Sequence, residues 1–374
     1  MTSPDPESAA GPAPAATSVS ASAEGAVDPV KRLDAAAGPL AETEAAWDTF
    51  VEQCPEATFF HRVGWRRILE ETLGHRAFYL YSEREGAITG VLPLGQVKSL
   101  LFGNALISVP FCVYGGVAAQ DARAAASLTE AARALAEELQ VDYLELRHRA
   151  RRNPDWPCKD DLYVTFRKAL APEPEKNLQA IPRKQRAMVR KGIKYALQSA
   201  VDSGIERFYP IYASSVQRLG TPVLPRRYFQ ALRETFGADC DVVTTTKDGE
   251  PVSSVLNFYF RDEVLPYYGG GTEQARALAG FDFLYWEVMR RACEQGYRWF
   301  DYGRSKRGTG SFSFKKNWGF EPQPLYYEYH LVGAKQIPEI NPLNPKYRLF
   351  IAGWKRLPLF VANWLGPWLA RRIG

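Results

Sequence analysis

The order of secondary-structure elements repeats within this chain, and the repeat limits the possible folds more than any other feature. Alternating apolar residues predict strands at 78–81 and 88–94, an alanine-rich helix at 121–139 and a strand at 141–147. The same order follows downstream, in the ranges 241–246, 252–260, 264–268, 281–295 and 299–302. Two copies of one unit predict a mixed α/β (α+β) fold with two tandem domains.

Matching landmarks support this duplication. Tyr114-Gly-Gly in the first copy corresponds to Tyr268-Gly-Gly in the second. From Gly116 to Arg147 is 31 positions, and from Gly270 to Arg304 is 34. Two unrelated α/β domains remain the alternative. A chain of 374 residues exceeds one ordinary core, and we divide it into a disordered Ala/Pro-rich tail, two domains and a basic, Trp-rich tail, at 1–40, 41–165, 166–332 and 333–374.

Cysteine and histidine usage excludes several classes of site. The five cysteines are widely spaced without a CxxC pair, which argues against a zinc site or a disulfide framework and favours a reducing compartment. The four histidines have no partner at metal-ligand spacing, and neither GxSxG nor HExxH occurs. We therefore expect no metal and no Ser-His-Asp or Cys-His machinery. His148, between two arginines, is expected at the surface.

The stretch 297–320, YRWFDYGRSKRGTGSFSFKKNWGF, concentrates charge and aromatic rings. A short strand ends at Gly303, a loop with two further glycines follows, and the alternation of Phe312 and Phe314 predicts a second strand that carries Lys315 and Lys316. From residue 304 to residue 316 five cations accompany the single carboxylate of the stretch, Asp301, among aromatic side chains. Such a pocket suits an anionic group or a transition state that carries negative charge. An ordinary glycine turn with a solvated lysine pair is the alternative.

The strings D-Y-G-R-S and F-K-x-x-W-G in this stretch resemble the C-terminal signature of the FemAB-type acyltransferases. The resemblance extends over roughly residues 45–332 and is closest to FemAB-like proteins found with exosortase (PEP-CTERM) and exopolysaccharide systems. It implies two GNAT-like domains and transfer of an aminoacyl or acyl group to an amine or hydroxyl of a cell-envelope precursor. The acceptor is then a muropeptide or a lipid-linked or polymeric sugar.

The resemblance also implies roles for individual residues. Lys315, at the lysine of the family's F-K motif, stabilises negative charge on the transition state, although its neighbour Lys316 could take this role. Asp301 orients Arg304 or an incoming amine. The remaining residues that we expect to bind substrate are Tyr302, Tyr268, Trp318, Arg186 and Arg190. Trp318 departs from the family pattern, which often has Phe at this position.

The acyl donor stays open between aminoacyl-tRNA and acyl-CoA. Proteins that use acetyl-CoA usually carry a glycine-rich turn at a helix N-terminus, where backbone N–H groups bind pyrophosphate. The corresponding segment here, 274–282, contains one glycine. This departure argues against an ordinary CoA site and fits the aminoacyl-tRNA donors of the FemAB pattern.

Two basic segments complete the sequence. Residues 176–201 hold seven Lys or Arg and no acid, and we predict a helix at 182–199 with Val189, Ile193, Ala196 and Leu197 on its buried face. Arg186 and Arg190 on this helix would meet phosphates. Residues 340–374 hold six Lys or Arg and no acid, together with Trp354, Trp364 and Trp368. The longest uncharged run there has 14 residues, too few to cross a bilayer but suited to its headgroup layer. A tail that packs on the protein's own surface is the alternative.

We therefore expect a cytoplasmic acyltransferase, with possible peripheral contact with an anionic membrane. We expect no signal peptide within residues 1–40, because they hold no basic segment followed by an apolar run. A non-catalytic GNAT-fold scaffold of an envelope assembly system is the alternative, and a nucleic-acid-binding protein is a third interpretation that one basic helix supports only weakly. The sequence leaves the acyl group, the acceptor and the oligomeric state open.

Overall fold

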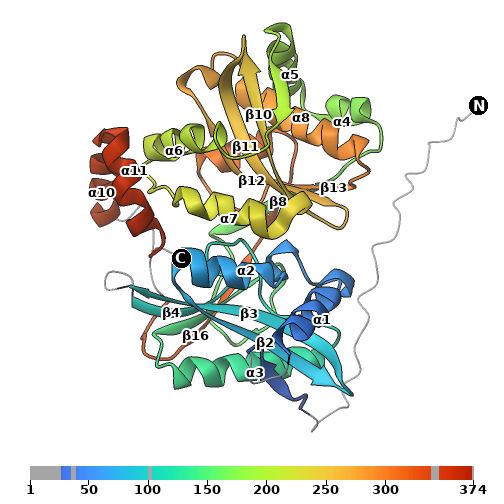
Figure 1. Ribbon diagram of the computed structural model, residues 1–374, viewed down its shortest axis with the longest axis vertical. Coiled ribbons are helices and arrows are strands. Elements are labelled where there is room, and N and C mark those ends of the chain that lie inside the picture. The colour runs from blue at the N-terminus through green and yellow to red at the C-terminus, as the bar shows by residue number, and fades with distance from the viewer. Residues whose placement is uncertain (1–26, 35–38, 100–102, 338–344, 373–374) are drawn as a thin grey trace, which may run out of the picture.

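The computed structural model describes residues 27–34, 39–99, 103–337 and 345–372, which build two mixed sheets of eight strands each. Figure 1 shows the two units stacked, with the first sheet below and the second above. Both the mixed α/β class and the tandem arrangement predicted from the sequence are confirmed. Each sheet contains one parallel pair of strands in its otherwise antiparallel order, β4 with β6 and β12 with β13.

The first sheet is flanked by helices α1 (Leu40–Gln53), α2 (Gly64–Arg67) and α3 (Ala122–Glu138). A π-helical turn, Ile68–Leu73, continues α2. Asp121 starts α3, because its carboxylate accepts a hydrogen bond from Ala124 N. The strand order is β1 (Val30–Arg32), β2 (Arg76–Arg84), β3 (Ala87–Ser99), β4 (Gly103–Ser108), β6 (Tyr143–His148), β16 (Tyr326–Leu331) and β7 (Cys158–Lys159), with β5 (Ala118–Ala119) on β3.

The second sheet carries helices on both faces. On one face α8 (Gly280–Glu294) packs with α4 (Pro174–Ala180) and α5 (Arg183–Lys194), while α6 (Phe208–Leu219) and α7 (Arg226–Phe236) cover the other. The strand order is β14 (Ser305–Lys306), β8 (Tyr163–Ala169), β13 (Trp299–Asp301), β12 (Glu263–Gly271), β11 (Glu250–Phe260), β10 (Cys240–Lys247) and β9 (Gln198–Val201), with β15 (Pro322–Pro324) on β8.

The boundary between the units differs from the division at residue 165. Strand β8 starts before that boundary but pairs with β13 in the second sheet, and β16, assigned by sequence to the second domain, pairs with β6 in the first. The chain therefore crosses between the sheets twice. Sequence periodicity places a strand but does not say which neighbour it pairs with, because that choice depends on long-range packing.

One aromatic core runs through both units. The ring of Phe59, from the first unit, stacks on Phe258 of β11 with 4.4 Å between centroids, and Phe60 packs against Tyr267 of β12 at 5.2 Å. These residues belong to one continuous buried cluster with Trp47, Tyr114 and Phe236. Because burial of each large aromatic stabilises by about 1.5–3 kcal/mol, this shared core fixes the two units against each other.

The two ends of the chain also differ from expectation. The proposed disordered tail 1–40 is too long, because β1 pairs with β2, and the buried carboxylate of Asp28 forms ion pairs with Arg84 and Arg123. Residues 1–26 and 35–38 lie outside the described part. At the other end, helices α10 (Pro345–Arg356) and α11 (Leu359–Ala370) form a hairpin against α6 (Figure 1), and Trp354 is buried there instead of facing outward.

Candidate functional site

The second sheet opens where β12 and β13 diverge. The two strands pair in parallel only at Glu263–Trp299 and Val264–Phe300, after which β12 follows β11 while β13 ends at Asp301. Beyond the paired residues, Gly269 of β12 lies close to α8, since a Cβ added there would lie 2.9 Å from the hydroxyl oxygen of Tyr285. Backbone groups of diverging strands lose their ladder partners, so such an opening can bind an acyl group through main-chain donors.

Asp301 anchors the first face of this opening. Its carboxylate is fully buried and accepts hydrogen bonds from Thr165 Oγ1 at 2.9 Å, Gly303 N at 2.7 Å and the hydroxyl of Tyr114. Tyr114 belongs to the first unit, so Asp301 joins the two units. Asp301 holds the backbone of the turn at Gly303, and no hydrogen bond or ion pair links it to Arg304 among the described residues, so of its two expected roles only that toward an incoming amine stays a prediction. Gly303 adopts a φ of 64°, which favours glycine at this turn.

Glu263 lies on the same face at the start of β12. Burial, and next the charge of Asp301, raise the pKa of Glu263 to about 7, although Arg167 acts in the opposite direction. Arg167 forms an ion pair with Glu263 and lies over the ring of Trp299, with 3.9 Å between the guanidinium carbon and the ring centroid. A carboxylate with a pKa near neutrality can accept a proton from a nucleophile. Sequence reasoning missed Glu263, since a single acid at a strand start carries no signal.

The strand predicted for residues 312–316 is wrong, because these residues lie in helix α9 (Gly310–Asn317). Thr309 caps the helix by accepting a hydrogen bond from Phe312 N, and the helical spacing of Phe314 and Trp318 outweighs the short F-x-F alternation. On this helix Lys315 points inward and Lys316 is exposed. The structure thus distinguishes the two lysines, which the sequence left interchangeable.

The ammonium group of Lys315 holds the turn after β13. Its Nζ donates hydrogen bonds to the carbonyl oxygens of Tyr302, Gly303 and Arg304, at 2.7, 3.0 and 3.1 Å. Burial lowers the pKa of Lys315 to about 7, with Asp301 acting in the opposite direction. Arg304 is part-buried; its Nη1 donates to the hydroxyl of Tyr327 at 2.9 Å, and its guanidinium lies over the rings of Tyr163 and Tyr327.

The predicted aromatic positions occupy different places. Tyr302 is buried, its ring 5.0 Å from that of Tyr285, and its hydroxyl has no hydrogen-bond partner in the described part of the chain. Tyr268 is half-buried, and its hydroxyl is 2.9 Å from that of Tyr228. Trp318 does not line an opening, because it is fully buried and its Nε1 donates to Asp282 at 3.0 Å. Tyr285, which the sequence analysis did not select, packs against Tyr302 and places its hydroxyl beside Gly269 of β12.

Helix α5 is shorter than predicted, and the face that it buries differs from the predicted one. It ends at Lys194 and packs on α8 through Gln185, Val189 and Gly192, whereas Ile193 is half-exposed. Ala196, with a φ of 54°, ends the helical conformation. Arg186 donates to Gln179 O, Arg190 is exposed, and no interaction connects either of them with Lys315 or Asp301 in the described ranges. The structure therefore does not bring these arginines into the opening.

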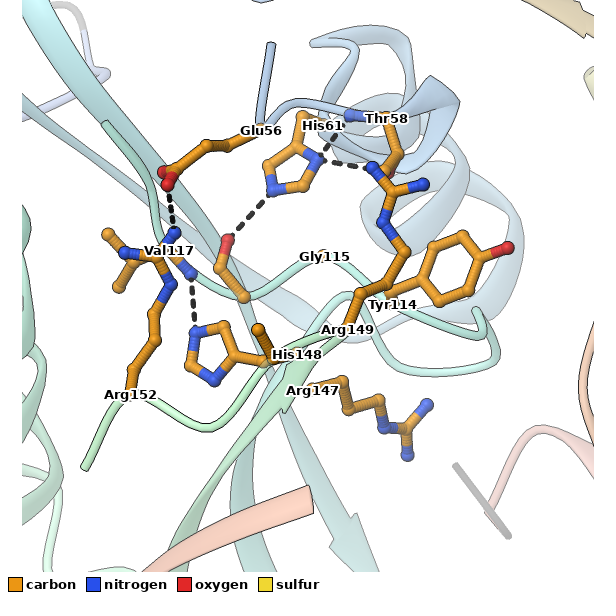
Figure 2. A pocket seen from close by; sticks show the side chains of 12 residues that line it. Glu56, Thr58, His61, Tyr114, Gly115, Val117, Arg147, His148, Arg149 and Arg152 are labelled. Carbon is orange, nitrogen blue, oxygen red and sulfur yellow. Dashed lines mark hydrogen bonds and ion pairs between the residues drawn. The ribbon is translucent and has the colours of Figure 1, made fainter. Parts of the chain in front are cut away.

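A cavity of about 180 Å³ lies in the first unit, beside the same junction. Figure 2 shows His61, the turn at Gly115 and the side chains after β6 around it. His61 Nε2 is 2.8 Å from Gly116 O, and Arg152 pairs with Glu56. Arg149 lies over the ring of Tyr114, 5.4 Å from its centroid. Tyr114 therefore connects a guanidinium at the cavity with Asp301 at the sheet opening.

The two histidines of this cavity are buried and neutral. Burial lowers the pKa of His61 to about 4, so it carries no charge at neutral pH. His148, expected at the surface, is buried; it accepts a hydrogen bond from Val117 N at 3.0 Å and contacts Glu328 at 2.8 Å. The prediction failed because β16 returns to the first sheet and covers it. No group of residues suited to holding a metal occurs in the described ranges.

Residues 176–316 match the family model described as "Acetyltransferase (GNAT) domain". Over this range the second unit is similar to GNAT acetyltransferase domains. The enzyme class expected from the sequence, an acyltransferase of the GNAT type, is confirmed. The match covers α5, the opening between β12 and β13, and Lys315 on α9. No curated protein matches the sequence.

Solved structures share the fold over both units. The crystal structure of FemX is 13% identical, with a TM-score of 0.60 over 82% of this chain and 98% of that one. The C-terminal domain of a putative lysylphosphatidylglycerol synthetase from Agrobacterium fabrum is 14% identical, with a TM-score of 0.54 over 77% and 92%. A protein of unknown function from Bacteroides thetaiotaomicron is 8% identical, with a TM-score of 0.53 over 82% and 100%. The two-unit fold is therefore shared with FemX.

Proposed function

We propose that this chain transfers an aminoacyl or acyl group to an amine or hydroxyl of an anionic cell-envelope precursor. The observation that carries the proposal is the junction itself. Glu263 and Asp301 in the second unit face Tyr114 and Arg149 of the first, beside the opening of a GNAT sheet. An acyl group held in the opening and an acceptor held in the first unit would meet there.

The chemistry needs no covalent enzyme intermediate. The acceptor's amine or hydroxyl attacks the acyl carbonyl, its proton passes to the Glu263 carboxylate, and the leaving group takes a proton as it departs. The buried hydroxyls of Tyr302 and Ser305 lack partners in the described chain and flank the turn at Gly303. Lys315 acts chiefly by positioning, because its donors are used by three carbonyls, while its charge favours an oxyanion nearby.

Contacts at the start of α8 favour a donor other than acetyl-CoA. The carboxylate of Asp282 lies in the first turn of α8, where it accepts hydrogen bonds from Trp318 Nε1 and Gln185 Nε2. An acid in the first turn already interacts with the helix dipole and repels a second anion. The exposed cations of α5 have no acidic partner among the described residues and suit a phosphodiester backbone, as in aminoacyl-tRNA; they are Arg183, Lys184, Arg190 and Lys194.

The proposal of an anionic acceptor rests on charge. Arg149 at the cavity of the first unit pairs with no acid in the part that the structure describes, so a phosphate or carboxylate of the acceptor can bind it. The fold shared with FemX and with the putative lysylphosphatidylglycerol synthetase supports an envelope precursor or lipid as acceptor. A PEP-CTERM or exopolysaccharide system remains one setting for such an acceptor. The scaffold alternative draws support from Lys315, whose donors are all used internally.

Mass spectrometry of reaction products tests the proposal. Purified protein is offered charged tRNA, acetyl-CoA or long-chain acyl-CoA, with muropeptide precursors or lipid-linked sugars as acceptors. We expect an aminoacylated acceptor, and a rate about 10²–10⁴-fold lower for Glu263→Gln than for the exposed control Glu250→Gln. Transfer from acetyl-CoA but not from charged tRNA would overturn the donor assignment. Absence of transfer with every pair would favour the scaffold.

A further inference from the structure

Helix α11 has its large and small side chains on the faces opposite to those of an ordinary surface helix. The face packed against the protein carries small residues at helical spacing, Ala362, Gly366 and Ala370, all of them buried. The outward face carries Phe360, Trp364 and Trp368, which are 75%, 78% and 45% exposed. Large aromatic residues at i, i+4 and i+8 form one stripe. Surface helices of soluble proteins normally turn such a stripe toward the core.

The helix is firmly attached, so its outward face is fixed relative to both units. A Cβ at Gly366 would lie 3.0 Å from Val223 N, which shows how closely α11 approaches the segment after α6. The side chain of Gln217 donates to the carbonyls of Trp354, Lys355 and Leu357 in the α10–α11 hairpin. Arg371 O, at the end of α11, lies 2.6 Å from His75 Nε2 of the first unit. The stripe is therefore part of the folded body.

Cations lie at the C-terminal end of the stripe. Residues 340–374 contain no acid, and Arg372 continues the stripe with its guanidinium 4.1 Å from the ring centroid of Trp368. Beyond it lies a hollow of about 880 Å³ between the end of α11 and strands β2 to β4. Its lining carries one carboxylate, Asp142, and four cations, which are Arg76, Lys98, Arg371 and Arg372. Asp142 accepts a hydrogen bond from Asn104 N.

We propose that α11 docks the protein onto an anionic lipid surface, with the aromatic stripe among the headgroups and the lipid phosphates in the hollow. Tryptophan and tyrosine favour the boundary between lipid and water, and juxtamembrane cations bind anionic lipid. With 12 residues at 1.5 Å each, α11 is about 18 Å long, well short of a bilayer core of about 30 Å. It therefore lies in the plane of the surface. No helix in the described ranges could cross a membrane.

Charge favours lipid over a second copy of this chain. In a two-fold dimer through α11, the same cations of both copies would face each other without acids. An anionic surface would instead neutralise Lys355, Arg356, Arg371 and Arg372. Docking does not depend on the proposed reaction and can be measured without substrate. It would hold the protein beside lipid-linked acceptors.

Vesicle binding of the full chain tests this proposal. We expect the protein to co-sediment with phosphatidylglycerol-rich vesicles and only weakly with phosphatidylcholine vesicles. Trp364→Ser should weaken binding by about tenfold or more, because it removes one large aromatic from the contact. Ile193→Ser, which removes a similarly exposed apolar side chain on α5, is the control and should leave binding unchanged. Arg372→Gln should weaken binding to phosphatidylglycerol by about fivefold and not affect phosphatidylcholine.

Three results would overturn the proposal. The wild type could fail to bind phosphatidylglycerol vesicles, or Trp364→Ser could bind as the wild type does. The third result comes from sedimentation velocity without lipid. It would be a wild-type dimer that Trp364→Ser converts into monomers while vesicle binding stays unchanged. Because Trp364 is exposed, we expect the variant to keep the thermal stability of the wild type.

Discussion

Replacing Lys315 with methionine tests the physical argument for the turn after β13. The ordinary pKa of a lysine is 10.5, whereas burial lowers that of Lys315 to about 7. Above pH 10.5 the Lys315 side chain is neutral in both the folded and the unfolded chain, so folding buries no charge. As the pH falls toward 7 the unfolded chain takes up a proton that the folded chain resists. The unfolding free energy of the wild type should therefore rise with pH between about 7 and 10.5.

The size of this rise follows from the shift. One pKa unit corresponds to about 1.4 kcal/mol, so the full window gives at most roughly 5 kcal/mol. The three carbonyl acceptors favour the ammonium and reduce this amount. In the methionine variant these carbonyls lose their donor, and each unsatisfied buried acceptor costs about 1–3 kcal/mol. We expect the variant to be less stable throughout, by a margin that widens as the pH rises.

Urea denaturation followed by tryptophan fluorescence measures this margin. The unfolding free energies of the wild type and Lys315→Met are compared at several pH values between about 7 and 10. The contributions of other titrating groups are the same in both proteins and cancel in the difference. Lys316→Met is the matched control, since the neighbouring lysine is exposed and should give a margin that does not change with pH. A margin for Lys315→Met that stays constant or narrows would show that the carbonyls outweigh burial, and would refute the argument.

Three further substitutions test the junction and the packing of α5, each by urea denaturation. Tyr114→Phe should lower the unfolding free energy by about 1.5–3 kcal/mol, because it removes a donor to a buried carboxylate; the control Tyr267→Phe, whose hydroxyl donates to a neutral carbonyl at 3.3 Å, should cost less. The pKa of Glu263 is raised from 4.5 to about 7, so wild-type stability should fall as the pH rises through this window, and Glu263→Gln should lack that fall. Gly192→Ala should cost about 1–3 kcal/mol, because the new Cβ would lie 2.7 Å from Phe283 Cβ, whereas Gly353→Ala on α10 meets no atom within 4 Å and should not destabilise.

Local pattern was enough to predict the tandem fold, and it pointed to residues 297–320, whose role in a reaction stays a prediction. The helix α8 and the strands β10 to β13 lie within a few residues of their expected positions, because long periodic segments bury one face. The FxF motif at 312–314 led to the wrong prediction of a strand. Two alternating residues also fit a helix, and the pattern does not reveal that Thr309 caps one. Glu263 and Tyr285 were missed because their importance comes from what is packed around them.

The chain crosses between the two sheets at strands β8 and β16, and these crossings explain why we place the proposed reaction at the junction of the units. The second sheet is built from residues 163–324 alone, whereas the first sheet is completed by β16, which the chain reaches only after it has left the second unit. Tyr327 of β16 receives the hydrogen bond of Arg304 and donates to Val113 O, which ties the turn after β13 to the loop that carries Tyr114. A displacement of the units would therefore break the Arg304, Tyr327 and Asp301 contacts together. The acyl opening and the arginine-lined cavity keep a fixed separation because the chain crosses between them, so an acceptor bound in the first unit would reach a donor held by the second.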